Sequence, residues 1–210
     1  VVLLAERNAR QWWLVPEGGT LVVKKGISFV TGKTTFKTDD PELSRTYAPV
    51  AVPRGAAPAL EQAFDDRAAL DQALFALLAR WARDDLQSEQ PERIAEARGY
   101  LQRAARLGGL APVQRDDLRT LQGEIAFYEA AWQLEQGAES LRRAAEQLRL
   151  ASEGRGPVAA EALSLGKTIE PVVAGASQAA LEASRFASER HARAASPAPA
   201  APPPAEGAGR

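Results

Sequence analysis

Apolar and polar residues follow two different periods in the two parts of the chain. Residues 11–38 are rich in β-branched and aromatic side chains and are interrupted by Gly-containing segments at short intervals. This pattern predicts a small antiparallel β-meander. From residue 59 to residue 193, apolar side chains recur every three or four positions, which predicts α-helices. The expected fold is therefore α+β and mainly α.

The β-meander is expected to contain three or four short strands. Turns are predicted at 16–19, 24–26 and 31–33, where Pro, Gly and Lys gather. A strand is predicted over 27–30, between the second and third of these turns. So few strands cannot bury a large core alone, so we expect the sheet to pack against another part of the chain.

Residues 39–58 are expected to form an irregular, Pro-rich linker. Four prolines in this short segment oppose a continuous helix and favour extended backbone. Tyr47 and Val50 are the apolar side chains that we expect to hold the linker against a helical surface.

The helical segment is predicted to form a stack of antiparallel hairpins, either repeat-like or a bundle. Prolines and glycines divide it into six helices, because Pro suits a first helical turn and Gly suits a helix end. The predicted helices cover about 59–86, 91–107, 112–136, 138–153, 158–167 and 171–193. Connections this short make neighbouring helices antiparallel. Residues 194–210, rich in Pro and Ala, are expected to be disordered.

Two of the predicted helices share a small-large-small pattern. Ala97, Leu101 and Ala104 form the first copy, and Ala144, Leu148 and Ala151 form the second, 47 residues later. Over about residues 60–153 the chain thus resembles the tetratricopeptide-like class of helical repeats. The resemblance implies a groove for a partner peptide or protein and no catalytic residues. An unrelated antiparallel helical bundle is the alternative.

The first ten residues resemble the end of a membrane-anchor helix. The apolar run 1–4 is followed by Arg7 and Arg10 and then by Trp12 and Trp13. Charged residues and Trp commonly gather where a transmembrane helix leaves the bilayer. The alternative is an amphipathic lead-in whose Trp pair packs in the core. We expect membrane association, with the side of the membrane open, and a soluble protein is the alternative.

The composition excludes several kinds of chemistry. The chain has no Cys and one His, so neither Cys-ligated metals nor a His-rich zinc site are available. Four Asp pairs occur, at 39–40, 65–66, 84–85 and 116–117, but none has the third Asp of a magnesium-binding Asp-rich motif, and we expect solvated helix faces there. The net charge of −1 opposes nonspecific nucleic-acid binding. We therefore predict no catalytic residues, no cofactor and no metal.

The best sequence-based interaction surface lies in the meander. Trp12 and Trp13 are adjacent, so in a strand they point to opposite faces, leaving one free for a partner or for lipid headgroups. Most of the chain's lysines are close to them in sequence. The predicted surface consists of Trp12, Trp13, Lys24, Lys25, Lys33 and Lys37. A solvated basic hairpin is the simpler alternative.

These observations favour a noncatalytic, membrane-anchored adaptor or scaffold that binds a protein partner through its helical surface. Two other functions stay open. A carboxylate-dependent enzyme, with or without a metal, would need acids from different helices to converge in a pocket. A structural subunit of a larger assembly would need an open strand edge. The sequence leaves the oligomeric state undetermined.

Overall fold

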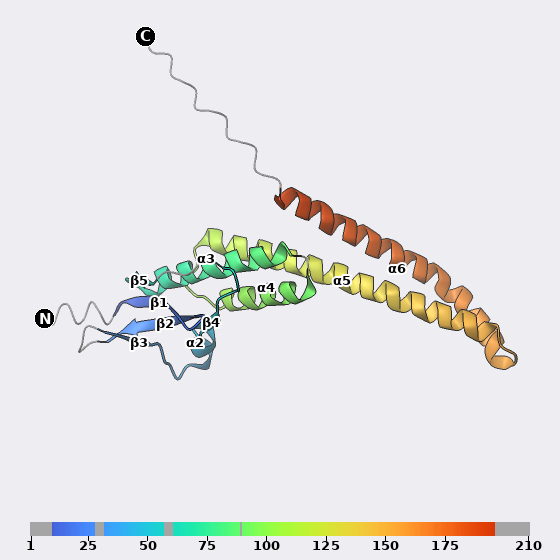
Figure 1. Cartoon of the computed structure of the whole chain (residues 1–210), viewed down its shortest axis with the longest axis horizontal. Coiled ribbons are helices and arrows are strands. Elements are labelled where there is room, and N and C mark those ends of the chain that lie inside the picture. The colour runs from blue at the N-terminus through green and yellow to red at the C-terminus, as the bar shows by residue number, and fades with distance from the viewer. Residues whose placement is uncertain (1–9, 28–31, 57–60, 89, 196–210) are drawn as a thin grey trace, which may run out of the picture. The chain divides into compact units, whose positions relative to one another are not determined.

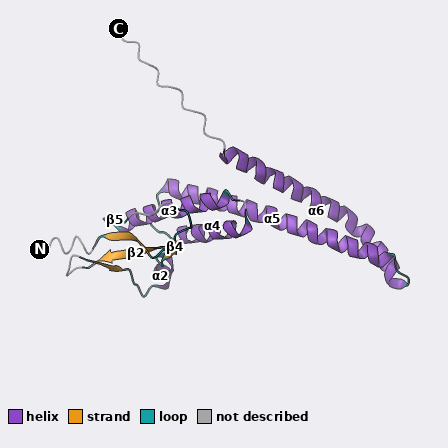
Figure 2. Cartoon of the chain, in the orientation of Figure 1, coloured by secondary structure: helices purple, strands orange, loops and turns teal. Residues whose placement is uncertain are grey.

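The chain contains an N-terminal antiparallel sheet followed by long helices, which confirms the predicted α+β, mainly α class (Figures 1 and 2). The computed structural model describes residues 10–27, 32–56, 61–88 and 90–195. The residues divide into two compact units, one ending at Glu129 and one beginning at Ala130. Each unit is described by itself.

The sheet is built on one tight hairpin. β1 (Trp12–Glu17) and β2 (Thr20–Gly26) are joined by Gly18 and Gly19, whose φ angles of 55° and 81° suit a two-residue hairpin turn. β3 (Lys33–Thr35) and β4 (Val50–Ala51) pair with β2, and β5 (Gln62–Phe64) pairs with the other edge of β1. All four pairings are antiparallel.

Two details of the predicted meander are wrong. Residues 24–26, expected to be a turn, form the end of β2, where Lys24 pairs with Thr35 of β3. Strand pairing on both sides of β2 keeps this segment extended in spite of its composition. β5 lies where the first helix was expected to begin, and that helix starts only at Arg67. Residues 28–31, most of the strand predicted over 27–30, lie outside the described residues.

The segment predicted as a linker contains regular structure. α2 (Pro41–Thr46) is a short helix whose N-cap is Asp40, because the Asp40 carboxylate accepts hydrogen bonds from the amides of Glu42 and Leu43 at 2.8 and 3.3 Å. Tyr47 and Val50 follow it and are 4% and 7% exposed. Tyr47 reaches Asp71 of the first long helix, as expected for a residue that holds this segment to a helical surface.

The first unit has its core where α3 (Arg67–Leu86) packs against α4 (Pro91–Ala104) and against β1 and β5. Ala97 and Ala104 are fully buried and Leu101 is 1% exposed, so the first small-large-small pattern faces the core. Small side chains allow two helices to approach closely. In the second copy, by contrast, Ala144 and Ala151 are exposed.

Two predicted helix breaks are wrong. α5 (Pro112–Ser152) passes through Gly137 without interruption, and α6 (Pro157–Ala195) passes through Pro171. One Gly costs a helix only about 1 kcal/mol, which the Ala, Leu, Glu and Arg residues around Gly137 offset. Pro171 and Lys167 are both exposed, so water can reach the Lys167 carbonyl, which loses its helical donor there. The four predicted helices after residue 111 are therefore two long ones.

Candidate interaction surfaces

The two tryptophans of β1 lie on opposite faces of the sheet. Trp12 is 8% exposed, and its ring lies 5.0 Å from the ring of Phe36 and 6.0 Å from that of Tyr47. Trp13 is half-buried on the other face. Trp12 is thus a core residue, and Trp13 is the one that a partner or a headgroup could reach.

The strand register brings the tryptophans next to two of the predicted lysines. Trp12 lies opposite Lys25 and Trp13 lies opposite Lys24. The ammonium group of Lys25 lies 5.0 Å from the centre of the Trp12 ring, a cation–π contact. The predicted residues are therefore divided between the two faces of the sheet, Trp12 with Lys25 on one face and Trp13 with Lys24 on the other.

Much of the charge of this surface is already used within the sheet. Lys24 forms an ion pair with Glu17, and Lys33 forms one with Glu61. Lys37 is exposed just after β3. The exposed positive charge is smaller than the sequence alone indicates, so strong attraction to an anionic partner is not built into this face.

A buried polar cluster joins the segment after α2 to the helices. The Tyr47 hydroxyl donates to Asp71 Oδ1 at 2.5 Å and accepts from Arg67 Nε at 2.7 Å. The other Asp71 oxygen accepts from the Gly109 amide at 2.9 Å. Burial, followed by the hydrogen bond to Asp71, raises the pKa of Tyr47 well above its ordinary value. Each of these polar groups is paired, so the cluster is structural.

The Asp pairs have separate structural roles. Asp40 caps α2, Asp66 caps α3, and Asp117 pairs with Arg83 at 2.5 Å. Asp85 differs from the prediction of a solvated face, because its side chain is 1% exposed and forms an ion pair with Arg93. Burial raises the pKa of the Asp85 carboxyl, and Arg93 opposes that shift. Within the described parts of the chain, no three acidic or His side chains are placed to hold a metal ion.

The helices of the second unit carry a coiled-coil-like seam. Inward-facing positions alternate at spacings of three and four residues, the pattern with which two helices pack along their length. In α5 the seam residues are Ala131, Leu134, Ala138, Leu141, Ala145, Leu148 and Ser152. In α6 they are Ala159, Ala162, Gly166, Ile169, Val173, Ala176, Ala180, Ala183 and Ala187. Of these residues Ala138 and Ala162 are buried, Leu134 is 42% exposed and the others are half-buried, so the seam is partly open to water.

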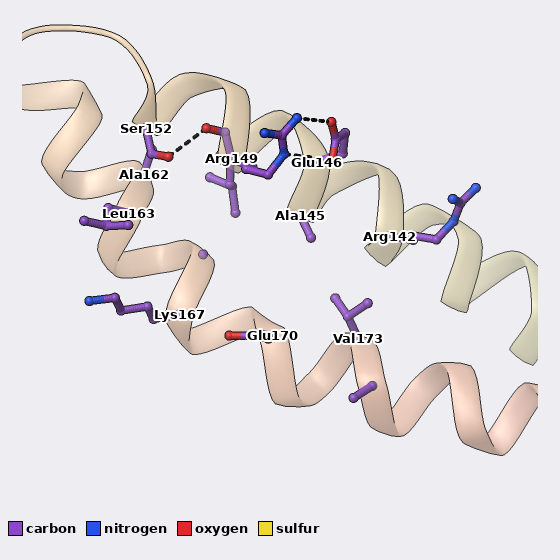
Figure 3. Close-up of a pocket in the computed structure, with 13 residues that line it drawn as sticks. Arg142, Ala145, Glu146, Arg149, Ser152, Ala162, Leu163, Lys167, Glu170 and Val173 are labelled. Carbon is purple, nitrogen blue, oxygen red and sulfur yellow. Dashed lines mark hydrogen bonds and ion pairs between the residues drawn. The ribbon is translucent and has the colours of Figure 1, made fainter.

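A groove runs along one side of this seam (Figure 3). One hollow of about 550 Å³ lies between residues 142–152 of α5 and 162–174 of α6. A second hollow of about 520 Å³ continues it between residues 135–142 and 177–184. We call the two together the hairpin groove. Leu148, Leu163 and Val173 contribute to its apolar lining.

Charged side chains border the groove. Arg142, Glu146 and Arg149 come from α5, and Lys167 and Glu170 come from α6. Arg149 bonds to Glu146 at 2.8 Å, and this hydrogen bond lowers the pKa of the Glu146 carboxyl. A lowered pKa keeps that carboxylate ionised, as in a surface ion pair. The groove thus has an apolar floor and an ionic rim.

Exposed large apolar side chains gather on the same two helices. Among the described residues, eleven large hydrophobic side chains are exposed, and nine of them belong to residues 130–195. The nine are Trp132, Leu134, Leu150, Val158, Leu163, Leu165, Val172, Leu181 and Phe186. Residues 130–195 thus expose more large apolar side chains than the other described residues do. The helical period of residues 171–193 predicts Val172 and Phe186 on the inner side of that helix, whereas both are exposed.

Comparison of the chain with protein-family models, curated proteins and solved structures finds no match. In the part of the chain that the structure describes, no helix combines the length and the apolar character needed to cross a bilayer.

Proposed function

We propose that this protein is a noncatalytic adaptor whose α5–α6 hairpin binds an amphipathic helix of a partner protein in the hairpin groove. The observation that carries the proposal is an apolar-floored groove along an incompletely closed helical seam. A partner helix with apolar residues at i, i+3, i+4 and i+7 supplies the side chains that the seam lacks. The partner's charged flanks meet the rim of Arg142, Glu146 and Arg149.

The dimensions of the groove support this occupant. Its α5 wall runs from Glu135 to Ser152. At 1.5 Å per residue this is about 26 Å, enough for a helix of about 17 residues. The groove has two successive hollows, so more than one side chain of the partner helix can insert into it. A partner helix packed between α5 and α6 would bury the apolar floor of the groove, which is open to water in the single chain.

The tetratricopeptide-like resemblance and the membrane anchor remain part of this proposal. The resemblance implies the same kind of ligand, a helical peptide or protein. The anchor rests on the apolar run 1–4 and the neighbouring Arg7 and Arg10. Residues 1–9 lie outside the described residues. Because Trp12 is a core residue, only Trp13 of the tryptophan pair remains to contact headgroups.

Site-specific photo-crosslinking in cells tests the groove. A photoreactive residue at Leu163, which lines the groove, should yield one discrete crosslinked partner. The matched control is the adjacent Ser164, which is exposed and does not line the groove. Both variants should show the same helical circular dichroism. Equal crosslinking at the two positions, or none at Leu163, would contradict the proposal.

A further inference from the structure

The side of the α5–α6 hairpin opposite the groove carries two uncharged rows. In each helix, groove-lining residues such as Arg142 and Leu163 directly follow a seam residue. The residues that directly precede the seam therefore lie on the other flank, because successive helical residues are about 100° apart. Because the two helices are antiparallel, the residues that directly precede the seam in α5 and those that directly precede it in α6 lie on the same side of the hairpin. We call this side the back face.

The two rows of the back face have opposite shapes. The α6 row consists of Val158, Leu165, Val172, Ala179 and Phe186; all but Ala179 are large, and these four are 66%, 54%, 53% and 58% exposed. We call it the large row. The small row of α5 consists of Ala130, Gly137, Ala144 and Ala151, all of them exposed. Both rows keep positions that differ by multiples of seven residues. Neither row contains a charge, although charged residues make up 25% of the chain.

These rows are complementary to one another across a two-fold axis. A two-fold rotation places α6 of one copy against α5 of the other, so that the large row of the first copy meets the small row of the second. By symmetry, the large row of the second copy meets the small row of the first. Such an isologous interface needs only one surface on each copy. Alternating large and small residues is how facing helices interdigitate in four-helix bundles.

The area of the back face is sufficient for a dimer. Two helices, each about 10 Å wide, over about 22 residues cover about 20 by 33 Å. Two such faces together bury about 1,300 Å², within the range of specific interfaces.

The border of the back face favours a protein surface over an anionic lipid surface. On α6 the remaining residues that directly precede the seam include Glu161 and Glu182, which are exposed and acidic. On α5 the equivalent residues are Gln133, Ser140 and Gln147, which are exposed and uncharged. An acidic border opposes adsorption to an anionic lipid surface. A second copy of the chain is therefore the occupant that suits this face.

We propose that two copies of this chain associate through the back faces of their α5–α6 hairpins and form a four-helix bundle. The assignment does not depend on a partner in the groove, because it uses the other side of the same hairpin. The groove of each copy remains open in this dimer, and the dimer presents two grooves.

Sedimentation equilibrium of the full 210-residue chain tests this assignment. The wild-type protein should sediment at twice the 22.5 kDa of one chain at micromolar concentration. Leu165→Glu should weaken the dimer by about 100-fold or more, because it buries a charge in both copies of the interface. Gly137→Leu, which fills the small row, should weaken it too. The adjacent Ser164→Glu is the matched control and should have no effect.

Several results would overturn the dimer. A wild-type chain that is monomeric up to about 100 µM has no interface of this kind. Equal effects of Leu165→Glu and Ser164→Glu would place the contact elsewhere. A dimer broken by Leu163→Asp and not by Leu165→Glu would assign the contact to the groove. A monomer that binds neutral phosphatidylcholine vesicles through Leu165 would make lipid the occupant. Circular dichroism of each variant verifies that the helices remain folded.

Discussion

The hydroxyl of Tyr47 donates a hydrogen bond to Asp71 Oδ1 at 2.5 Å, and Asp71 is only 1% exposed. The two residues are 24 positions apart and belong to different elements. Through this bond the segment that follows α2 is attached to α3. A buried carboxylate needs such donors, since its hydration is lost on folding.

Replacing Tyr47 with Phe should lower the free energy of unfolding by about 1.5–3 kcal/mol, the usual contribution of a hydrogen bond to a charged group. Urea denaturation at neutral pH measures the change. Tyr100→Phe is the matched control, because Tyr100 lies against Trp81 and its hydroxyl has no hydrogen bond to any described residue. Equal losses in both variants would show that the bond to Asp71 is not the cause.

The same bond predicts a pH dependence. Because the pKa of Tyr47 is raised in the folded protein, the unfolded chain loses this proton first as pH rises through 10.0. Wild-type stability should therefore fall relative to Tyr47→Phe above that pH. Denaturation of both proteins at pH 8 and at higher pH measures the difference. A constant difference over this range would contradict the raised pKa.

Gly109 should not tolerate a side chain. A Cβ atom there would lie 2.6 Å from Ala68 Cα and 3.1 Å from Asp71 Oδ2, so backbone must shift. Gly109→Ala should cost about 3 kcal/mol, since overpacking against backbone is expensive. At Gly108 an added Cβ meets nothing within 4 Å, so Gly108→Ala should change stability by less than about 1 kcal/mol. Thermal denaturation compares the two variants.

Arg93 should stabilise the ionised form of the buried Asp85 carboxylate. Removing one partner of a buried ion pair leaves an uncompensated charge, so Arg93→Gln should cost about 2–3 kcal/mol at neutral pH. Protonation of Asp85 removes that charge, so the cost should shrink as pH falls toward the ordinary Asp value of 3.8. The double variant with Asp85→Asn should recover most of the loss. Denaturant titrations at two pH values measure these changes.

The exposed pair of Arg98 and Glu129 provides the control for Asp85. Their side chains are 52% and 32% exposed. Arg98→Gln should cost less than about 1 kcal/mol at every pH, as exposed ion pairs do. An Arg93→Gln penalty that persists unchanged at low pH would show that packing, and not the buried charge, accounts for it.

The two tryptophans of β1 should respond differently to truncation. Trp12→Ala removes a buried ring that contacts Phe36 and Tyr47 and should cost about 3–5 kcal/mol. Trp13→Ala removes a half-buried ring and should cost clearly less, about 1 kcal/mol. Chemical denaturation of both variants measures this. A larger loss for Trp13 would reverse the assignment of the two faces.

Much of the fold follows from sequence periodicity, and the exceptions have physical causes. The different periods of the two segments correctly predict strands for β1 and β2 and helices from Arg67 onward. Gly137 and Pro171 are predicted helix breaks, yet the surrounding helix formers and an exposed position allow both residues inside continuous helices. β5 and the end of β2 depend on pairing with strands distant in sequence, which local composition does not encode.

The interaction sites were less predictable. The pairing of Tyr47 with Asp71 has no sequence signature, because it joins elements brought together only by the fold. The Trp–Lys surface was predicted as a set, but the partners Glu17 and Glu61 that reduce its charge depend on the strand register. The seam of α5 and α6 is present in the sequence at three- and four-residue spacing. Its failure to close is visible only in the structure.

The affinity of the crosslinked partner for groove variants tests the central claim, that the hairpin groove is the binding site, most directly. Leu163 is 51% exposed, so Leu163→Asp should leave the fold intact. We predict that it weakens binding by at least about 10-fold, whereas the adjacent Ser164→Asp changes it by less than about twofold. Equal affinity of wild type and Leu163→Asp, measured by isothermal titration calorimetry, would contradict the account.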